Sequence, residues 1–370
     1  MKSAVNIARI LVGCLFIFSG LVKAIDPLGL AYKMQEFFEV WAREGFMKGT
    51  MMWLYEYALW FSLIMITLEV VLGIALLLGW RTKLVSWLLL LLMLFFTFLT
   101  SYVLFSGKIK ACGCFGDCIP LTPVQTFTKD IILLILVLLI LFGRKYIRPL
   151  FSNVMNGAML LLGLFFVGGL QWYVLKFLPV KDCLPFKTGN NILELRKMPK
   201  DAVADKYDYV FMYEKNKVKK EFKVDSLPDD TWQFVSRDQI LIEKGKNNVP
   251  LINDFTLATA SGTDPTQSVL STRGEYYLLF VKDISKIKKD WVKDQVVAGE
   301  IVKNGKPVFV VASQRKNAEE RYRTFNIPVL TGDATAIKTA ARNNVTLYLM
   351  DGPVVKNKWG GNDIEKALNK

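Results

Sequence analysis

Cysteines are the residues of this sequence whose type and spacing could do chemistry. Three of the five lie within seven residues, at Cys112, Cys114 and Cys118, and the glycines between them let the backbone turn tightly. A fourth, Cys183, follows the last long apolar segment. Neighbouring thiols suit thiol–disulfide exchange, in which one thiolate attacks and a second resolves the mixed disulfide. The pattern therefore predicts four catalytic cysteines.

Two other interpretations of these cysteines stay open. A structural disulfide from Cys118 or Cys112 to Cys183 would staple the loop to the start of the following domain. A metal bound by all four thiolates would require pairs spaced like Cys-x-x-Cys, and we predict no metal site. The fifth cysteine, Cys14, lies inside an apolar segment, and we predict that it is a small packing residue.

Histidine is absent from the whole sequence. Imidazole is the commonest general base and metal ligand in proteins. The composition therefore excludes Ser-His-Asp chemistry, His-bound zinc and His-ligated haem. Any chemistry must come from cysteine, carboxylate, lysine, tyrosine or a bound cofactor.

Five apolar segments are long enough to cross about 30 Å of hydrocarbon. We predict membrane spans at residues 5–25, 53–80, 84–105, 126–143 and 155–178. A cleaved signal peptide is the alternative for the first of these segments, but it lacks a small-x-small cleavage site. The chain is therefore expected to be an integral membrane protein.

Basic residues in the short connections predict the orientation. Arg81 and Lys83 separate the second and third spans, and Arg144, Lys145 and Arg148 separate the fourth and fifth. The positive-inside rule makes both loops cytoplasmic, so the N-terminus is expected inside and the C-terminal domain outside. We expect a bacterial inner membrane with the cysteines at its periplasmic face, which permits disulfides.

The remainder of the chain reads as water-soluble. The net charge of +14 is spread over mixed Lys, Asp and Glu without a nucleic-acid motif, so we predict the bilayer and no nucleic acid as a partner. We expect a transmembrane domain at 1–180, a β-rich connecting region at 181–270 and an α/β domain at 271–370.

Alternating patterns predict the elements of the soluble part. A hairpin is expected over residues 207–213 and 218–224. Beyond it we predict the order strand, helix, strand, helix, strand, strand, helix, at residues 276–281, 287–302, 307–312, 318–325, 346–350, 354–359 and 363–368.

The N-terminal half resembles DoxX-type membrane proteins of the Bacteroidetes type. The resemblance rests on Arg9–Gly13, Phe18–Pro27 and Glu69–Gly79, and the segment Cys112–Asp117 is similar to the branch that contains the methylamine-utilisation protein MauE. The similarity implies a four-helix bundle related to quinone-linked, VKOR-like disulfide-forming enzymes. It also implies a periplasmic thiol protein as partner.

Glu69 lies deep in the second predicted span, where a carboxylate is expensive. It could exchange protons with a quinone, and we predict it as a cofactor-binding residue. The alternative is a protonated Glu69 bonded to a neighbouring helix. For Lys23, Asp26 and Glu56 we expect side chains that reach out to the membrane surface.

Residues after about 275 resemble the second half of a thioredoxin-like domain. The similarity lies in Thr346–Gly352 followed by Val354–Lys356. No cysteine follows the first predicted strand, and Val345 stands where that family has a cis-proline. A dithiol mechanism within this domain is therefore excluded.

Together these observations predict a periplasm-facing membrane thiol–disulfide oxidoreductase, linked to a quinone, that acts on an envelope protein. The alternative is a non-enzymatic envelope scaffold or assembly factor with structural disulfides and a docking thioredoxin-like domain.

Overall fold

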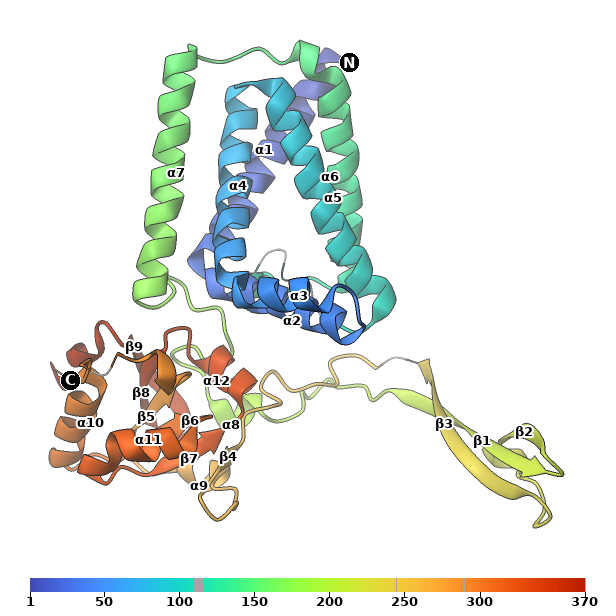
Figure 1. Ribbon diagram of the computed structural model, residues 1–370, viewed down its shortest axis with the longest axis vertical. Helices are drawn as coiled ribbons and strands as arrows, with labels where there is room; N and C mark the ends of the chain where they lie inside the picture. The colour runs from blue at the N-terminus through green and yellow to red at the C-terminus, as the bar shows by residue number, and fades with distance from the viewer. Residues whose placement is uncertain (110–112, 114–115, 244, 289, 370) are drawn as a thin grey trace.

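The architecture was analysed in a computed structural model, which describes residues 1–109, 113, 116–243, 245–288 and 290–369. A bundle of long helices forms the N-terminal half, and a separate sheet domain lies at one end of it (Figure 1). The predicted architecture, a transmembrane bundle followed by a soluble α/β domain, is confirmed.

Within the part of the chain that the structure describes, five helices are long and apolar enough to span a membrane. They are α1 (Lys2–Ile25), α4 (Ala58–Leu78), α5 (Thr82–Ser106), α6 (Pro123–Gly143) and α7 (Asn153–Lys176). At about 1.5 Å per residue, 21 residues already cross about 30 Å. The predicted five spans are confirmed, and the Thr122 capping box, in which the Thr122 and Gln125 side chains satisfy each other's backbone N–H, sets where α6 begins.

Glycines let α1 and α4 cross closely. A β-carbon at Gly73 would lie 2.9 Å from the carbonyl oxygen of Gly13, and one at Gly20 would meet the side chain of Val70 at 2.5 Å. The helix α7 stands at the periphery of the bundle, with many side chains exposed to the surroundings (Figure 1). Cys14 is also exposed on the outer surface of the bundle, so our prediction that it packs inside is wrong.

Two amphipathic helices lie across the end of the bundle nearest the soluble domain (Figure 1). They are α2 (Pro27–Arg43) and α3 (Lys48–Glu56), and α2 buries Leu30, Met34 and Phe37. We had expected residues 53–57 in the second span. Instead α3 ends at Glu56 and the spanning helix begins only at Ala58.

The soluble domain is built on a six-stranded sheet. Its strands are β4 (Leu257–Ala258), β5 (Glu275–Val281), β6 (Val308–Ala312), β7 (Val329–Gly332), β8 (Val345–Asp351) and β9 (Val354–Gly360), in the order β4-β7-β6-β5-β8-β9. The strands β5, β6 and β7 are parallel, whereas β8 runs antiparallel to β5. Hydrophobic clusters cover both faces of the sheet, which explains the unbroken apolar run of β5.

Helices α10 (Lys293–Lys303), α11 (Arg315–Tyr322) and α12 (Ala334–Ala340) connect or flank these strands, and η6 (Ile364–Asn369) is a 3₁₀ helix. The predicted elements occur in the predicted order, but β7 and α12 were missed. The helix predicted at residues 287–302 begins only at Lys293, and the last predicted helix is the 3₁₀ helix η6. Phe186, Ile192 and Phe255 share the core with β5 and β8. The boundary predicted at residue 270 therefore runs through one core.

A three-stranded antiparallel arm projects from the soluble domain (Figure 1). It consists of β1 (Lys206–Lys215), β2 (Val218–Lys223) and β3 (Gln233–Glu243). The predicted hairpin is confirmed, and its turn places Asn216 and Lys217 at positive φ. The third strand was missed. Shorter elements are α8 (Ile192–Leu195), α9 (Thr266–Leu270), and the 3₁₀ turns η1 (Gly116–Cys118), η2 (Arg144–Tyr146), η3 (Val224–Ser226), η4 (Ile284–Lys286) and η5 (Arg323–Phe325).

Candidate functional site

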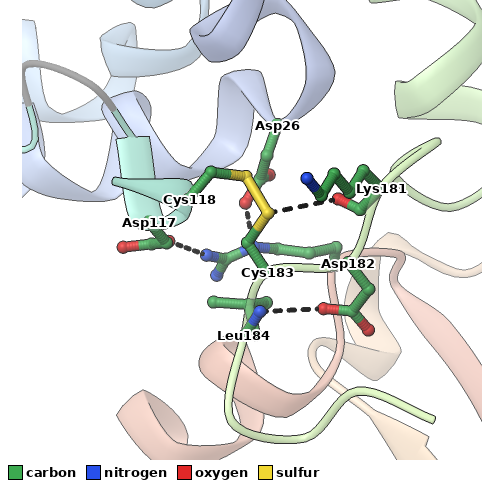
Figure 2. The surroundings of a disulfide bond; sticks show 8 residues. Asp26, Asp117, Cys118, Lys181, Asp182, Cys183 and Leu184 are labelled. Carbon is green, nitrogen blue, oxygen red and sulfur yellow. Dashed lines mark hydrogen bonds and ion pairs between the residues drawn. A yellow bond between two sulfur atoms is a disulfide. The ribbon is translucent and has the colours of Figure 1, made fainter. Parts of the chain in front are cut away.

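A disulfide joins Cys118 to Cys183 where the bundle meets the soluble domain (Figure 2). Cys118 ends η1, in the loop between α5 and α6, and Cys183 follows α7 by a few residues. Their Cα atoms are 4.9 Å apart. The bond confirms that both cysteines lie at the same membrane face and selects Cys118 from the two pairings that the sequence left open. Because its sulfurs are not thiolates, a metal site of four thiolates is incompatible with this state.

Cys112 and Cys114, the other two predicted site residues of this face, lie outside the described residues. Gly113 between them has φ +73°, and a β-carbon there would lie 3.1 Å from the side chain of Lys33 on α2. Gly116 has φ +59°. Glycine adopts such angles without the strain of a β-carbon, and at Gly113 it also leaves room for Lys33. Gly113 and Gly116 therefore permit backbone angles at these two positions that would strain most other residues.

Arg342 links this loop to the soluble domain and to α2. Its Nε donates to Asp26 Oδ2 at 2.7 Å, and its Nη2 donates to Asp117 Oδ2 at 2.7 Å. The two aspartates lie beside the disulfide in Figure 2. Burial alone would lower the pKa of Arg342, but the charges of Asp26 and Asp117 outweigh it and raise the pKa. The guanidinium therefore stays charged and bridges two carboxylates of the membrane domain.

Tyr32 of α2 inserts its ring among three cations of the soluble domain. Lys282, Lys338 and Arg342 lie 5.8, 5.6 and 5.5 Å from the ring centroid. Lys282 Nζ also donates to Tyr32 Oη at 3.1 Å and to the Arg342 carbonyl at 3.0 Å. Burial raises the pKa of Tyr32 to about 12, so the phenol stays protonated. The cation–π contacts of Lys338 and Arg342 help to hold the soluble domain against α2.

Lys282 makes this contact sensitive to pH. Burial, and then the charge of Arg342, lower the pKa of Lys282 from 10.5 to about 7, against an opposing effect of Asp26. Lys338 and Lys286 lower it further. Contact with Tyr32 of α2 adds to the burial of Lys282, so above about pH 7 a detached domain would bind up to one more proton here than the docked domain does. Docking should therefore strengthen as the pH rises above about 7 and be weakest below pH 7.

We predict that amide hydrogen exchange at residues 26–33 slows as the pH rises from 6.5 to 8.5, after correction for the intrinsic dependence of exchange on pH. Lys282→Met should flatten this profile because it removes the titrating group. Lys303→Met, at an exposed lysine of α10, is the matched control. An identical pH profile in the Lys282 variant would contradict the prediction.

The soluble domain also caps the end of α7. Asn343 Nδ2 donates to the carbonyl oxygens of Lys176 and Phe177 at 3.0 and 2.9 Å, and Asn362 donates to the Lys176 carbonyl as well. These carbonyls have no partners within the helix itself. Nearby, Lys358 forms an ion pair of 2.6 Å with Asp182. The described contacts that join the two domains are therefore largely polar.

Glu69 forms an ion pair with Lys23 inside the bundle. Lys23 Nζ lies 2.7 and 2.6 Å from the two carboxylate oxygens and 2.9 Å from Ser19 Oγ, and both charged residues are buried. Phe96 places its ring 5.0 Å from the same nitrogen. Our expectation that Lys23 reaches out to the membrane surface is wrong, because its partner lies inward. Asp26 pairs with Arg342, while Glu56 is exposed.

A second buried acid, Asp130 of α6, was missed by the sequence analysis. It accepts a hydrogen bond from Thr100 at 3.0 Å and pairs with Lys129 at 2.7 Å. Lys129 and Asp130 are adjacent charges just before an apolar run, and in the sequence they look like the polar end of a membrane span. A cavity of about 20 Å³ separates this pair from Lys23 and Glu69. It has room for about one water molecule.

Part of the chain matches known families. Residues 1–143 match the family described as methylamine utilisation protein MauE, and residues 207–244, nearly all of the arm, match a domain of unknown function (DUF8463). The predicted resemblance of the N-terminal half to MauE is thus supported. Its resemblance to DoxX proteins stays a prediction.

One curated relative is Protein TlpB of Flavobacterium psychrophilum, which is 35% identical over 137 residues. The match covers 36% of this chain and 35% of the relative, so it spans about a third of that protein's length. No solved structure matches the chain.

Proposed function

We propose that this membrane protein exchanges thiols and disulfides with an envelope protein, through Cys112 and Cys114. The observation that carries the proposal is the bond between Cys118 and Cys183. Because these two cysteines bind each other and Cys14 lies within a spanning helix, Cys112 and Cys114 are the remaining pair of the same loop. The Cys118–Cys183 bond then anchors the loop that carries them.

The proposed reaction is a two-electron exchange without an external oxidant. A partner thiolate attacks the Cys112–Cys114 disulfide and forms a mixed disulfide, releasing one of the two cysteines as a thiolate. A second partner thiol then displaces the other. The partner gains a disulfide, and Cys112 and Cys114 become thiols that take up the two protons. The reverse direction reduces a partner disulfide by the same steps.

The cavity beside Glu69 and Asp130 has room for about one water molecule, and Glu69 is already paired with Lys23. The proposal therefore routes no electron through a quinone. A role for Glu69 in cofactor binding stays a prediction.

The proposal places the cysteine loop and the soluble domain in the periplasm, with the N-terminus in the cytoplasm. The basic loops at residues 81–83 and 144–148 support this orientation by the positive-inside rule. In the structure both loops lie at the end of the bundle opposite the soluble domain (Figure 1). Reagents that modify cysteine without crossing membranes would test the orientation.

We propose a thioredoxin-like role without a dithiol for the soluble domain. The parallel strands β5 and β6 beside the antiparallel β8 and β9 support this resemblance. The segment after β5, from Lys282 to Lys286, has no cysteine and instead contacts α2 through Lys282. The domain would position the cysteine loop, and the cysteines of that loop would carry out the thiol–disulfide exchange.

The second candidate is a non-enzymatic envelope scaffold. The clamped Cys118–Cys183 bond favours it, because a disulfide held between ion pairs serves a structural role well. Under this alternative, Cys112 and Cys114 would also be structural. A partner that co-purifies equally with the wild-type protein and the Cys112→Ser/Cys114→Ser variant would favour it.

Exchange with a synthetic dithiol peptide distinguishes the two functions. Oxidised protein in detergent should convert about one peptide dithiol per chain to its disulfide in a single turnover. Cys112→Ser/Cys114→Ser should abolish this conversion. The matched control, Cys118→Ser/Cys183→Ser, should retain it when folded. Oxidation that survives without Cys112 and Cys114 would overturn the proposal.

A further inference from the structure

A cleft opens in the soluble domain where α7 leaves the membrane. It has a volume of about 210 Å³ and is lined by residues that include Lys286, Lys288, Trp291 and Asn362. Asn343 and Asn362, both in its wall, donate to the carbonyl of Lys176, the last residue of the spanning helix. The cleft is therefore at the level of the lipid headgroups.

The end of α7 carries residues typical of a membrane interface. Trp172 and Tyr173 are exposed within one turn of this end, and Lys176 Nζ lies 4.9 Å from the Trp172 ring. Exposed Trp and Tyr near the end of a spanning helix mark the membrane–water interface. A lipid molecule beside this end of α7 would hold its headgroup close to the cleft.

Positive charge dominates the polar groups around the cleft. Lys286 and Lys288 line it. Asp283 neutralises part of this charge through a 3.4 Å contact with Lys286, whereas Lys288 makes no ion pair with any residue that the structure describes. The site therefore has excess positive charge to offer to an anion.

The asparagine side chains of the cleft are not available to bind the anion, because each already donates a hydrogen bond within the protein. Asn343 and Asn362 donate to α7, and Asn344 Nδ2 donates to the Asp283 carbonyl at 2.9 Å. Their amide groups shape the wall, and the lysine ammonium groups are left to bind the ligand.

We propose that this cleft binds the phosphate-bearing headgroup of an anionic phospholipid. Lys286 and Lys288 bind the phosphate, and the Trp291 ring packs against the glycerol portion. The position of the cleft at the headgroup level and its positive charge together favour this ligand over a soluble anion. The acyl chains of such a lipid can stay in the bilayer beside α7 while its headgroup occupies the cleft. The bound lipid adds a contact between the soluble domain and the membrane that is independent of the cysteines.

Short-chain lipids test the site in the full-length protein. Dioctanoyl phosphatidylglycerol should bind in detergent solution and slow hydrogen exchange at residues 284–288 and 343–345. Dioctanoyl phosphatidylcholine should do so far less. Lys286→Gln/Lys288→Gln should weaken binding of the phosphatidylglycerol about 25-fold, at about fivefold for each surface lysine.

Lys219→Gln/Lys220→Gln on β2 is the matched control, because it removes the same charge far from the bundle. Equal binding of the two lipids, or equal losses in both double variants, would overturn the proposal. Inorganic phosphate provides a further arm. If phosphate slows hydrogen exchange at the same residues and at the same concentration as dioctanoyl phosphatidylglycerol, the cleft is a general anion site and the lipid assignment fails.

Discussion

Replacing Lys23 by methionine is expected to destabilise the bundle by about 3–5 kcal/mol. The substitution leaves the carboxylate of Glu69 without its cation at a site that is 4% exposed. An uncompensated charge buried in this way loses its hydration and gains no partner in return. Glu69→Leu should have a comparable effect, because it leaves the ammonium group of Lys23 unpaired.

The double variant Lys23→Met/Glu69→Leu should recover most of the lost stability. Removing both charges also removes the desolvation cost of each, so an apolar pair of similar volume is often neutral or stabilising. Unfolding in mixed micelles, titrated with a denaturing detergent, would measure all three variants. Lys197→Met breaks an ion pair of the same 2.6 Å length on the exposed surface and should change stability by less than about 1 kcal/mol.

These variants separate a structural ion pair from an incidental one. A Lys23→Met protein as stable as the wild type would mean that water or lipid headgroups reach Glu69. A double variant no better than either single variant would mean that packing, and not charge, dominates the site.

The sequence predicted the spans well because their hydropathy does not depend on partners. The helix α2 was not predicted because Lys33, Glu36 and Glu39 interrupt its apolar residues, as is typical of a helix that is only half buried. A search for long apolar segments passes over such a pattern. Its apolar spacing at Leu30, Met34 and Phe37 was the available signal.

Pairings between distant residues could not be predicted in the same way. Lys23 and Glu69 are 46 positions apart, and nothing in either local segment specifies the crossing of α1 and α4 that brings them together. The alternatives for Cys183 included Cys118, because the number of spans places both at one face. Choosing between Cys112 and Cys118 required the path of the loop.

Arg342 illustrates the same limit more strongly. In sequence it is a single arginine without a motif. Its role follows from Asp26 and Asp117, which lie 316 and 225 positions away. Such a contact exists only once the two domains have docked.

Arg342→Gln is expected to loosen the soluble domain and to make the Cys118–Cys183 bond easier to reduce. Truncating one partner of a buried, hydrogen-bonded charge pair costs about 2–5 kcal/mol. The lower end applies here because the Asp117 side chain is 41% exposed. Arg342 and the disulfide both hold η1 against the soluble domain. By thermodynamic linkage, the free energy by which the disulfide stabilises docking equals the free energy by which docking stabilises the disulfide.

The linkage gives two measurements that must agree. In Arg342→Gln, hydrogen exchange at residues 26–33 and 338–342 should accelerate by a factor of about 30, which corresponds to about 2 kcal/mol. In a series of thiol redox buffers, the ratio of reduced to oxidised Cys118–Cys183 should rise by no more than the same factor. Arg342→Lys, which keeps one of the two ion pairs, should lie between the variant and the wild type.

Arg315→Gln is the matched control. Arg315 also pairs with a carboxylate, that of Glu319, but on α11 and away from the junction. It should leave both measurements unchanged. If Arg342→Gln accelerates exchange at the junction without changing the reduction of the disulfide, the two contacts act independently. The soluble domain would then be tied to the cysteine loop by the covalent bond alone.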